Sequence, residues 1–260
     1  MTNQLINEGK TARTVVITGG SRGIGLETAK QFQRLGDRVI ITYKNTPPAD
    51  IDISLSISEG SDVKQDKLYP FHCDVNSAED IDNLFSYTES EFGACDILVL
   101  SAGINNDALL IRMSEEKWSN VIDTNLTSAY TVTHRALPAM IKKKSGRIIL
   151  ISSAVAMTGN PGQTNYAAAK AGLIGFGRSL AREIAGRSIT VNIVTPGITD
   201  TDMLAALTEE QLEALASKVP MGRVGSKEEV ASVICFLASE QASYITGAII
   251  AVDGGLGMGY

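Results

Sequence analysis

Three side chains in the middle of this 260-residue chain could move a proton to or from a carbonyl oxygen. Tyr166 and Lys170 are four residues apart, so in a helix their side chains share one face. A nearby ammonium favours the phenolate and brings the phenol pKa, ordinarily about 10, nearer to neutrality. Ser153 ends a hydrophobic run and could hydrogen-bond the same oxygen. The set predicts acid–base chemistry at a ketone or a secondary alcohol.

A glycine-rich turn near the start of the chain is the second group with a chemical meaning. It runs from Thr18 to Gly25, after Val15-Val16-Ile17 and before a helical pattern. Glycines let the chain turn sharply and let phosphate oxygens approach N–H groups at the positive end of a helix. Although any tight turn can use glycines, this strand–loop–helix context predicts a dinucleotide site, and hence an oxidoreductase. The residues expected to form the turn are Gly19, Ser21, Arg22, Gly23, Ile24 and Gly25.

The charge near the expected adenine ribose decides the type of nicotinamide cofactor. The second strand ends at Tyr43-Lys44, where no acidic residue stands to bind the 2′-hydroxyl of NAD and repel the 2′-phosphate of NADP. Arg22 and Lys44 could converge on that phosphate. The sequence therefore favours NADPH over NAD, although Asp50 and Asp52 could fold back and reverse the preference.

Several of these residues could instead have a purely structural role, with no part in chemistry. A Tyr-x-x-x-Lys spacing occurs by chance in many helices, and Tyr166 alone could be amphipathic surface. The two histidines, His72 and His134, stand apart from any cluster of ligands, which favours structural roles for both. The cysteines are Cys73, Cys95 and Cys235; their odd number, wide spacing and apolar surroundings predict buried thiols, with no metal and no disulfide.

The whole chain restricts the classes of function. A net charge of −6 and a pI near 5.1 oppose general binding to nucleic acid or to an anionic membrane. No stretch approaches the roughly 18 apolar residues that span a bilayer. Residues 1–12 are polar and lack the apolar core of a secretory signal, so we expect a cytoplasmic protein. We expect one domain over residues 1–260 with a flexible segment at 1–12.

Short β-branched runs alternate with longer helical patterns, which predicts an α/β, doubly wound, Rossmann-type fold with a parallel sheet. Residues 45–67 read as a loop or a short strand, and residues 199–223 as a mobile substrate lid. Ser77 and Ser226 are expected to cap helices, and Gly36 to end one. The predicted strands are Arg13–Thr18, Arg38–Tyr43, Leu68–Cys73, Asp96–Leu100, Arg147–Ile151, Ile189–Val194 and Ala248–Val252, and the predicted helices are Gly23–Leu35, Ala78–Phe92, Trp118–Lys143, Tyr166–Ala185 and Lys227–Ala238.

Taken together, the motifs resemble those of the short-chain dehydrogenase/reductase family, and within it the 3-oxoacyl-acyl-carrier-protein reductases. The resemblance runs from about Arg13 to the C-terminus and is weakest over residues 45–67. It departs from the family at Leu100-Ser101-Ala102-Gly103, where an Asn-Asn-Ala-Gly run is usual, which puts local rigidity in doubt. The matching pieces are Thr18 to Gly25, Cys73-Asp74-Val75, Ser101-Ala102-Gly103, Thr124-Asn125-Leu126, Ser153, Gly162 to Lys170, Pro196-Gly197, Tyr244 to Gly247 and Val252 to Gly255.

The resemblance implies a role for each matching residue. Tyr166 would donate the proton, Ser153 would orient the carbonyl, and Lys170 would bind the nicotinamide ribose and lower the tyrosine pKa. Asn125 would bend its helix and hold a water that connects Lys170 to solvent. The resemblance also implies a seven-stranded parallel sheet and a homotetramer formed through the helices that contain Asn125 and Tyr166. Further cofactor contacts would come from Tyr43, Lys44, Asp74, Val75, Ser101, Ala102, Gly103, Pro196, Gly197, Ile198 and Thr199.

A basic pair beside the mouth of the active site docks the acidic carrier protein in similar reductases, and the matching positions are Lys144 and Arg187. The resemblance thus implies NADPH-dependent reduction of a 3-oxoacyl-carrier substrate in fatty acid synthesis. Two alternatives stay open: a dehydrogenase of a sugar, polyol or other secondary alcohol, and a non-catalytic NADP-sensing regulator. A complete set of Ser153, Tyr166 and Lys170 argues against the sensor, which has no need of a proton donor.

Overall fold

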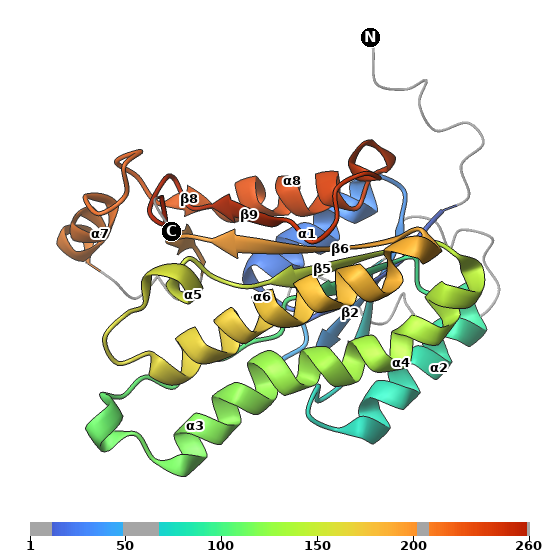
Figure 1. Cartoon of the computed structure of the whole chain (residues 1–260), viewed down its shortest axis with the longest axis horizontal. Helices are drawn as coiled ribbons and strands as arrows, with labels where there is room; N and C mark the ends of the chain where they lie inside the picture. The colour runs from blue at the N-terminus through green and yellow to red at the C-terminus, as the bar shows by residue number, and fades with distance from the viewer. Residues whose placement is uncertain (1–11, 49–67, 202–207, 259–260) are drawn as a thin grey trace, which may run out of the picture.

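One parallel β-sheet organises the molecule. The computed structural model describes residues 12–48, 68–201 and 208–258, and among these seven strands pair in the order β3-β2-β1-β4-β5-β6-β9, all in parallel (Figure 1). The order reverses between β1 and β4, so the carboxyl ends of these strands form the crevice where ligands bind in doubly wound folds. The predicted fold class is confirmed. The strands are β1 (Thr14–Thr18), β2 (Arg38–Tyr43), β3 (Leu68–His72), β4 (Ile97–Leu100), β5 (Gly146–Ile151), β6 (Ile189–Pro196) and β9 (Ile249–Val252).

Helices cover both faces of the sheet. Figure 1 shows α1 and α8 on one face, with α2, α4 and α6 on the other. The longer helices are α1 (Gly23–Arg34), α2 (Ala78–Phe92), α3 (Glu115–Ile122), α4 (Ser128–Lys143), α6 (Thr164–Ile184), α7 (Glu209–Ala216) and α8 (Lys227–Leu237). The shorter elements are η2 (Leu110–Arg112), α5 (Val155–Thr158), η4 (Ala185–Arg187), β7 (Thr199–Asp200), β8 (Gly225–Ser226) and η5 (Glu240–Ala242), and a π-helical turn, η3 (Asp123–Thr127), joins α3 to α4.

The strands are continuous apolar runs because both faces of the sheet are buried. Alternate residues of one strand enter two separate cores. Ile148 and Leu150 of β5 pack toward α2, α4 and α6, whereas Ile149 and Ile151 pack toward α1 and α8. All four side chains are at most 5% exposed. Burial on this scale fixes the register of the strands, and with it the place where each strand ends.

Side-chain caps fix where several helices begin. Ser77 accepts the Asp80 N–H at the start of α2, and Ser226 forms a capping box with Glu229 at the start of α8, as predicted. Gly36 follows α1 with a φ of 82°, which suits the predicted stop. Each predicted strand lies within two residues of the observed one.

The structure also differs from the sequence-based predictions. The predicted helix at Trp118–Lys143 begins three residues earlier, because Ser114 caps it by accepting the Lys117 N–H, and it is interrupted by the π-helical turn. The predicted lid contains β7, which pairs in parallel with β8, and helix α7. Residues 202–207 of that lid, residues 49–67 of the loop after β2 and residues 1–11 of the predicted flexible segment lie outside the described residues.

Candidate active site

The turn after β1 leaves the start of α1 without a side-chain cap. Arg22 occupies the cap position but makes no side-chain cap bond, and no acidic residue lies in the first turn. By contrast α2, α3, α7 and α8 each have a capping side chain and two acidic residues there. The N–H groups at the start of α1 therefore face outward at the positive end of a helix without a competing carboxylate, as a bound pyrophosphate requires.

Glycines are required at this turn by close backbone contacts. Gly19 has a φ of 66°, and a Cβ there would lie 2.7 Å from the Ala102 Cα. A Cβ on Gly25 would lie 2.4 Å from the Gly19 carbonyl oxygen. The Ala102 N–H donates to the Thr18 hydroxyl at 3.2 Å, which joins the turn to the end of β4. The fold thus presses the turn against the next strand, and only residues without a side chain fit.

Ser153, Tyr166 and Lys170 meet at the carboxyl end of β5. A hydrogen bond joins the side chains of Ser153 and Tyr166. Lys170 lies one turn further along α6, with its Nζ 5.7 Å from the centroid of the Tyr166 ring. The ammonium donates to the Ile151 carbonyl at 2.8 Å, and Lys170 as a whole is 4% exposed. The three side chains that the sequence singled out are thus brought together, two from α6 and one from the end of β5.

Burial controls protonation in this cluster. It raises the pKa of Tyr166; the hydrogen bond with Ser153 lowers that pKa and the charge of Asp107 raises it, and the net shift is upward. This net direction is opposite to the lowering that the resemblance implied. Burial also lowers the pKa of Lys170 from its ordinary 10.5 to about 8. At neutral pH the protein alone therefore holds a protonated phenol beside a protonated amine, which suits a proton donor.

Asn125 lies in the π-helical turn between α3 and α4 and is 2% exposed. Its Oδ1 accepts the Ile104 N–H at 2.8 Å, and its Nδ2 donates to the Ile104 carbonyl at 3.0 Å. A Cβ added to Gly103 would lie 3.2 Å from Asn125 Oδ1 and 3.4 Å from Lys170 Nζ, so both groups approach the same backbone position. The extra residue of a π-helical turn places Asn125 at the base of the cluster.

The remaining predicted cofactor contacts line the carboxyl edge of the sheet. Lys44, just after β2, forms an ion pair with Asp74 at 2.6 Å. Burial opposes ionisation of Asp74, but hydrogen bonds from Lys44 and the Asn76 N–H outweigh it and lower its pKa. The sequence-based prediction had set Lys44 beside Arg22 without this partner. The other predicted contacts at this edge are Ser21, Gly23, Ile24, Tyr43, Val75, Ser101, Pro196, Gly197, Ile198 and Thr199.

The basic pair lies elsewhere than expected. Lys144 ends α4, Arg187 ends η4 after α6, and both stand two residues before the paired starts of β5 and β6. They therefore lie at the amino edge of the sheet, whereas Tyr166 is near the start of α6 (Figure 1). Helix geometry puts about 27 Å between Tyr166 and the end of α6. Within one chain the pair therefore lies far from Tyr166, because α4 and α6 both run from the carboxyl edge of the sheet to its amino edge.

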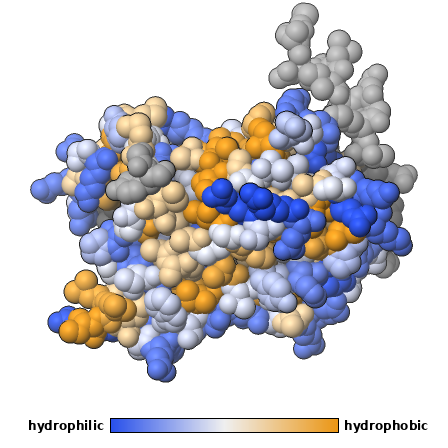
Figure 2. All heavy atoms as spheres, viewed as in Figure 1, coloured by the Kyte–Doolittle hydropathy of each residue, from blue (hydrophilic) through white to orange (hydrophobic). Residues whose placement is uncertain are grey.

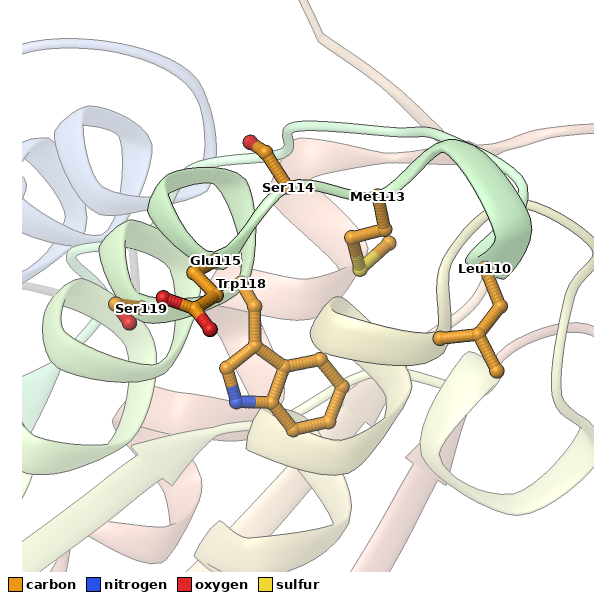
Figure 3. Close-up of a pocket in the computed structure, with 6 residues that line it drawn as sticks. All are labelled: Leu110, Met113, Ser114, Glu115, Trp118 and Ser119. Carbon is orange, nitrogen blue, oxygen red and sulfur yellow. The ribbon is translucent and has the colours of Figure 1, made fainter.

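Sequence reasoning missed two features next to Tyr166. Asn165, which precedes it, is fully buried, and its side chain bonds Asn106, Lys117 and Tyr166. Its place beside Tyr166 was visible, but nothing in the sequence indicated its partners. The second feature is a hollow of about 310 Å³ beside the start of α6, shown in Figure 3. Its lining is Leu110, Met113, Ser114, Glu115, Trp118 and Ser119.

The apolar side chains of this hollow belong to a larger exposed patch. Leu109, Leu110 and Ile111 are 57%, 66% and 91% exposed, and Trp118 is 40% exposed. Figure 2 shows apolar side chains gathered at the same end of the molecule, where η2 precedes α3. A run of Leu-Leu-Ile before a helix could have signalled this patch in the sequence.

The described part of the chain was also searched for a metal site, a reactive thiol and a membrane-spanning helix. Its His, Cys, Asp and Glu side chains form no group of three that could hold a metal ion. Cys73 and Cys95 are buried free thiols, and burial raises the pKa of Cys73 to about 12. No helix within the described ranges is long and apolar enough to cross a membrane.

Comparison of the sequence with known proteins identifies the family to which the chain belongs. A family model described as enoyl-(acyl carrier protein) reductase covers residues 19–257. The chain belongs to the short-chain dehydrogenase/reductase family, and is an oxidoreductase that acts on a keto or hydroxyl group.

Three relatives within the family are similar to the chain over nearly its whole length. The 3-oxoacyl-acyl-carrier-protein reductases FabG of Salmonella typhimurium and Escherichia coli are each 45% identical to the chain over 251 residues, which is 96% of this chain and 98% of theirs. The 3-oxoacyl-acyl-carrier-protein reductase MabA of Mycobacterium avium is 43% identical over 249 residues, 96% of this chain and 91% of its own length.

Proposed function

We propose that the protein reduces a 3-oxoacyl-acyl-carrier-protein to the 3-hydroxyacyl form with NADPH, in fatty acid synthesis. The observation that carries the proposal is the meeting of Ser153, Tyr166 and Lys170 at the carboxyl end of β5, beside an uncapped helix start. Relatives named for this reaction align over nearly the whole chain. We also propose that this reaction takes place in the cytoplasm.

The carboxyl edge fits a nicotinamide dinucleotide. The N–H groups at the start of α1 would hold its pyrophosphate, because they lack both a cap and an acidic neighbour. Asp74 and Val75 would lie beside the adenine, Ala102 and Gly103 along the groove, and Lys170 at the nicotinamide ribose. NADPH supplies a hydride to the carbonyl carbon when bound. Further contacts would come from Gly19, Ser21, Gly23, Ile24, Gly25, Tyr43, Ser101, Tyr166, Pro196, Gly197, Ile198 and Thr199.

The preference for NADPH rests on two cations at the end of β2 and in the glycine turn. Arg22 and Lys44 are both exposed, and among the described residues at the end of β2 no carboxylate faces the expected ribose except Asp74, which Lys44 neutralises. The Lys44–Asp74 pair means that a 2′-phosphate would compete with Asp74 for Lys44. We therefore assign the larger share of phosphate binding to Arg22, whose guanidinium can bind two oxygens at once.

Within the cluster each residue has a separate task. Tyr166 donates its proton to the oxygen of the carbonyl, and burial keeps the phenol protonated until then. Ser153 holds the same oxygen by a hydrogen bond, which orients it toward Tyr166. Lys170, with its pKa lowered to about 8 by burial, returns a proton to Tyr166 at neutral pH. Asn125 keeps the backbone at Ile104 in place and holds a water that links Lys170 to solvent.

The carrier protein would dock on Lys144 and Arg187. The end of α6, where Arg187 follows, lies about 27 Å from Tyr166, and Lys144 ends α4 at the same edge of the sheet. A carrier bound there therefore serves the active site of a neighbouring subunit. A homotetramer with α4 and α6 paired against their copies in antiparallel order would bring the two together. Exposed Ala168, Ala171 and Gly175 on α6 support such a contact, since small side chains let helices approach closely.

Charge reversal tests the docking proposal. Lys144→Glu with Arg187→Glu should raise KM for a carrier-bound substrate and leave KM for a short thioester analogue unchanged. Mixed oligomers then test action between subunits. Subunits carrying Tyr166→Phe, mixed with subunits carrying the reversed charges, should regain activity on the carrier-bound substrate. Equal effects on both substrates, or no recovery on mixing, would contradict docking as described.

A panel of substrates tests the function itself. The protein should oxidise NADPH in the presence of a 3-oxoacyl thioester, and NADH far more slowly. Turnover confined to sugars, polyols or other secondary alcohols would instead identify a dehydrogenase of that class. Tight NADPH binding without turnover of any ketone would identify a sensor.

A further inference from the structure

The start of α6 is held by one buried amide. Asn165 is fully buried, and it directly precedes Tyr166 in the first turn of the helix. Gln163, at the cap position, makes no side-chain cap bond, and the first turn has no acidic residue. The Oδ1 of Asn165 takes this place by accepting the Tyr166 N–H at 2.8 Å. One of the orphan donors of the helix start is thus satisfied by the residue beside the phenol.

The same amide ties α6 to two other segments. Its Nδ2 donates to the Asn106 carbonyl at 3.0 Å, in the loop after β4, and to the Lys117 carbonyl at 3.2 Å, in α3. Both amide protons and one lone pair are therefore used. An asparagine is the short side chain that offers two donors and an acceptor in one plane. Aspartate would set an oxygen against two carbonyls, and alanine would remove one hydrogen bond from each of three backbone groups.

Neighbouring bonds reinforce this junction. The Gln163 amide donates to Asp107 at 2.9 Å, and the Ala108 N–H donates to the Gly162 carbonyl at 2.9 Å. Loop residues 106–108 and residues 162–165 are thus joined along their length. Ser153 belongs to neither segment, since it follows β5. The distance between Ser153 and the Tyr166 hydroxyl therefore depends on how this junction seats the start of α6.

We propose that Asn165 is a positioning residue for the reaction: its buried carboxamide seats the start of α6 against α3 and the loop after β4, and thereby aligns the Tyr166 phenol with Ser153. The inference rests on the proposed role of Tyr166 as proton donor. It assigns no contact between Asn165 and substrate or cofactor. A displacement of the phenol by about 1 Å is enough to slow such a reaction by roughly 100-fold.

A matched buried asparagine separates alignment from simple loss of stability. Asn192 in β6 is also fully buried; it donates to the Ile245 carbonyl at 2.8 Å and accepts the Ala248 N–H at 3.2 Å. Asn165→Ala and Asn192→Ala both remove buried hydrogen bonds to the backbone, so both should lower Tm. Only Asn165→Ala should lower kcat, by roughly 100-fold, with KM for NADPH within about threefold of wild type. Its solvent deuterium isotope effect on kcat should also rise, because proton transfer becomes slower.

A second variant keeps the test decisive if the alanine variant does not fold. Asn165→Asp preserves the volume and the acceptor for Tyr166 but loses both donors, so it should show the same kcat loss and isotope effect. Equal kcat in the Asn165 and Asn192 variants would overturn the proposal. It would also be overturned if Asn192→Ala folds while neither Asn165→Ala nor Asn165→Asp does, because Asn165 would then be needed for folding. Full activity of Tyr166→Phe would instead refute the proposed function, a different outcome.

Discussion

Replacing Lys170 by methionine should stabilise the protein at neutral pH while it abolishes activity. Lys170 is 4% exposed, its ammonium donates to the Ile151 carbonyl, and burial lowers its pKa from 10.5 to about 8. Keeping Lys170 charged inside the folded protein at pH 7 therefore costs about 3 kcal/mol. Methionine has a similar length and no charge, so this cost disappears. Loss of the hydrogen bond to Ile151 destabilises the variant by about 1–2 kcal/mol, so its free energy of unfolding should rise by a net amount of about 1–2 kcal/mol.

The pH dependence of this gain does not depend on the lost hydrogen bond. The folded protein releases the Lys170 proton at a lower pH than the unfolded chain does, so between pH 8 and 10.5 the unfolded chain binds more protons. Wild-type stability therefore rises with pH across that window. The advantage of Lys170→Met should shrink by about 2–3 kcal/mol between pH 7 and pH 10, and should turn into a disadvantage.

Denaturant titration without cofactor, at one protein concentration and at both pH values, measures this difference. Lys142→Met, which replaces an exposed lysine on α4, is the control and should show no comparable change with pH. A stability difference between wild type and Lys170→Met that stays constant from pH 7 to pH 10 would refute the reasoning, because it would mean that water reaches the ammonium.

Three further predictions concern the cofactor turn and a helix cap. Arg22→Ala should lower kcat/KM for NADPH by roughly 10- to 100-fold, because charge-assisted hydrogen bonds to a phosphate contribute about 1.5–3 kcal/mol. Lys44→Ala should lower it less, because Lys44 is paired with Asp74. Both variants should change kcat/KM for NADH little, and parallel losses with both cofactors would contradict the assignment. Gly25→Ala should weaken NADPH binding and lower the free energy of unfolding by about 1–3 kcal/mol, since its Cβ would lie 2.4 Å from the Gly19 oxygen. Gly186→Ala, whose Cβ would meet nothing within 4 Å, is its control in a urea titration, and equal losses would disprove the steric argument. Ser226→Ala should cost about 1 kcal/mol in the same titration by removing the capping box of α8; an unchanged midpoint would show that water replaces the cap.

The strands and most of the site could be predicted from the sequence because local patterns determine them. Ile148 and Ile149 point to opposite faces of the sheet and both are buried, so each strand appears in the sequence as an unbroken apolar run. Tyr166 and Lys170 could be paired because the helix period fixes their separation. Ser77 and Ser226 could be identified as caps because a cap acts within three residues of its own position.

Contacts between distant segments could not be predicted in the same way. Nothing near Lys170 in the sequence indicates that its ammonium meets the Ile151 carbonyl, and nothing near Asn165 indicates Asn106 and Lys117. The position of Lys144 and Arg187 could not be predicted for a different reason. Both were matched to a basic pair beside a site mouth, yet the order of helices and strands already required the ends of α4 and α6 to lie at the opposite edge. The strand order thus indicates where these two helix ends lie, whereas a match of two basic residues to a family pattern does not.

The reaction assigned to Tyr166 is tested most directly by product formation in one comparison. Wild type and Tyr166→Phe are each mixed with NADPH and a 3-oxoacyl thioester, and the 3-hydroxyacyl product is measured against NADPH consumed. Wild type should form one product for each NADPH. Tyr166→Phe keeps the ring and loses only the hydroxyl, so it should bind NADPH within about threefold of wild type but react roughly 100- to 10,000-fold more slowly. Undiminished product formation by Tyr166→Phe, or no reduction of the thioester by wild type, would contradict the account.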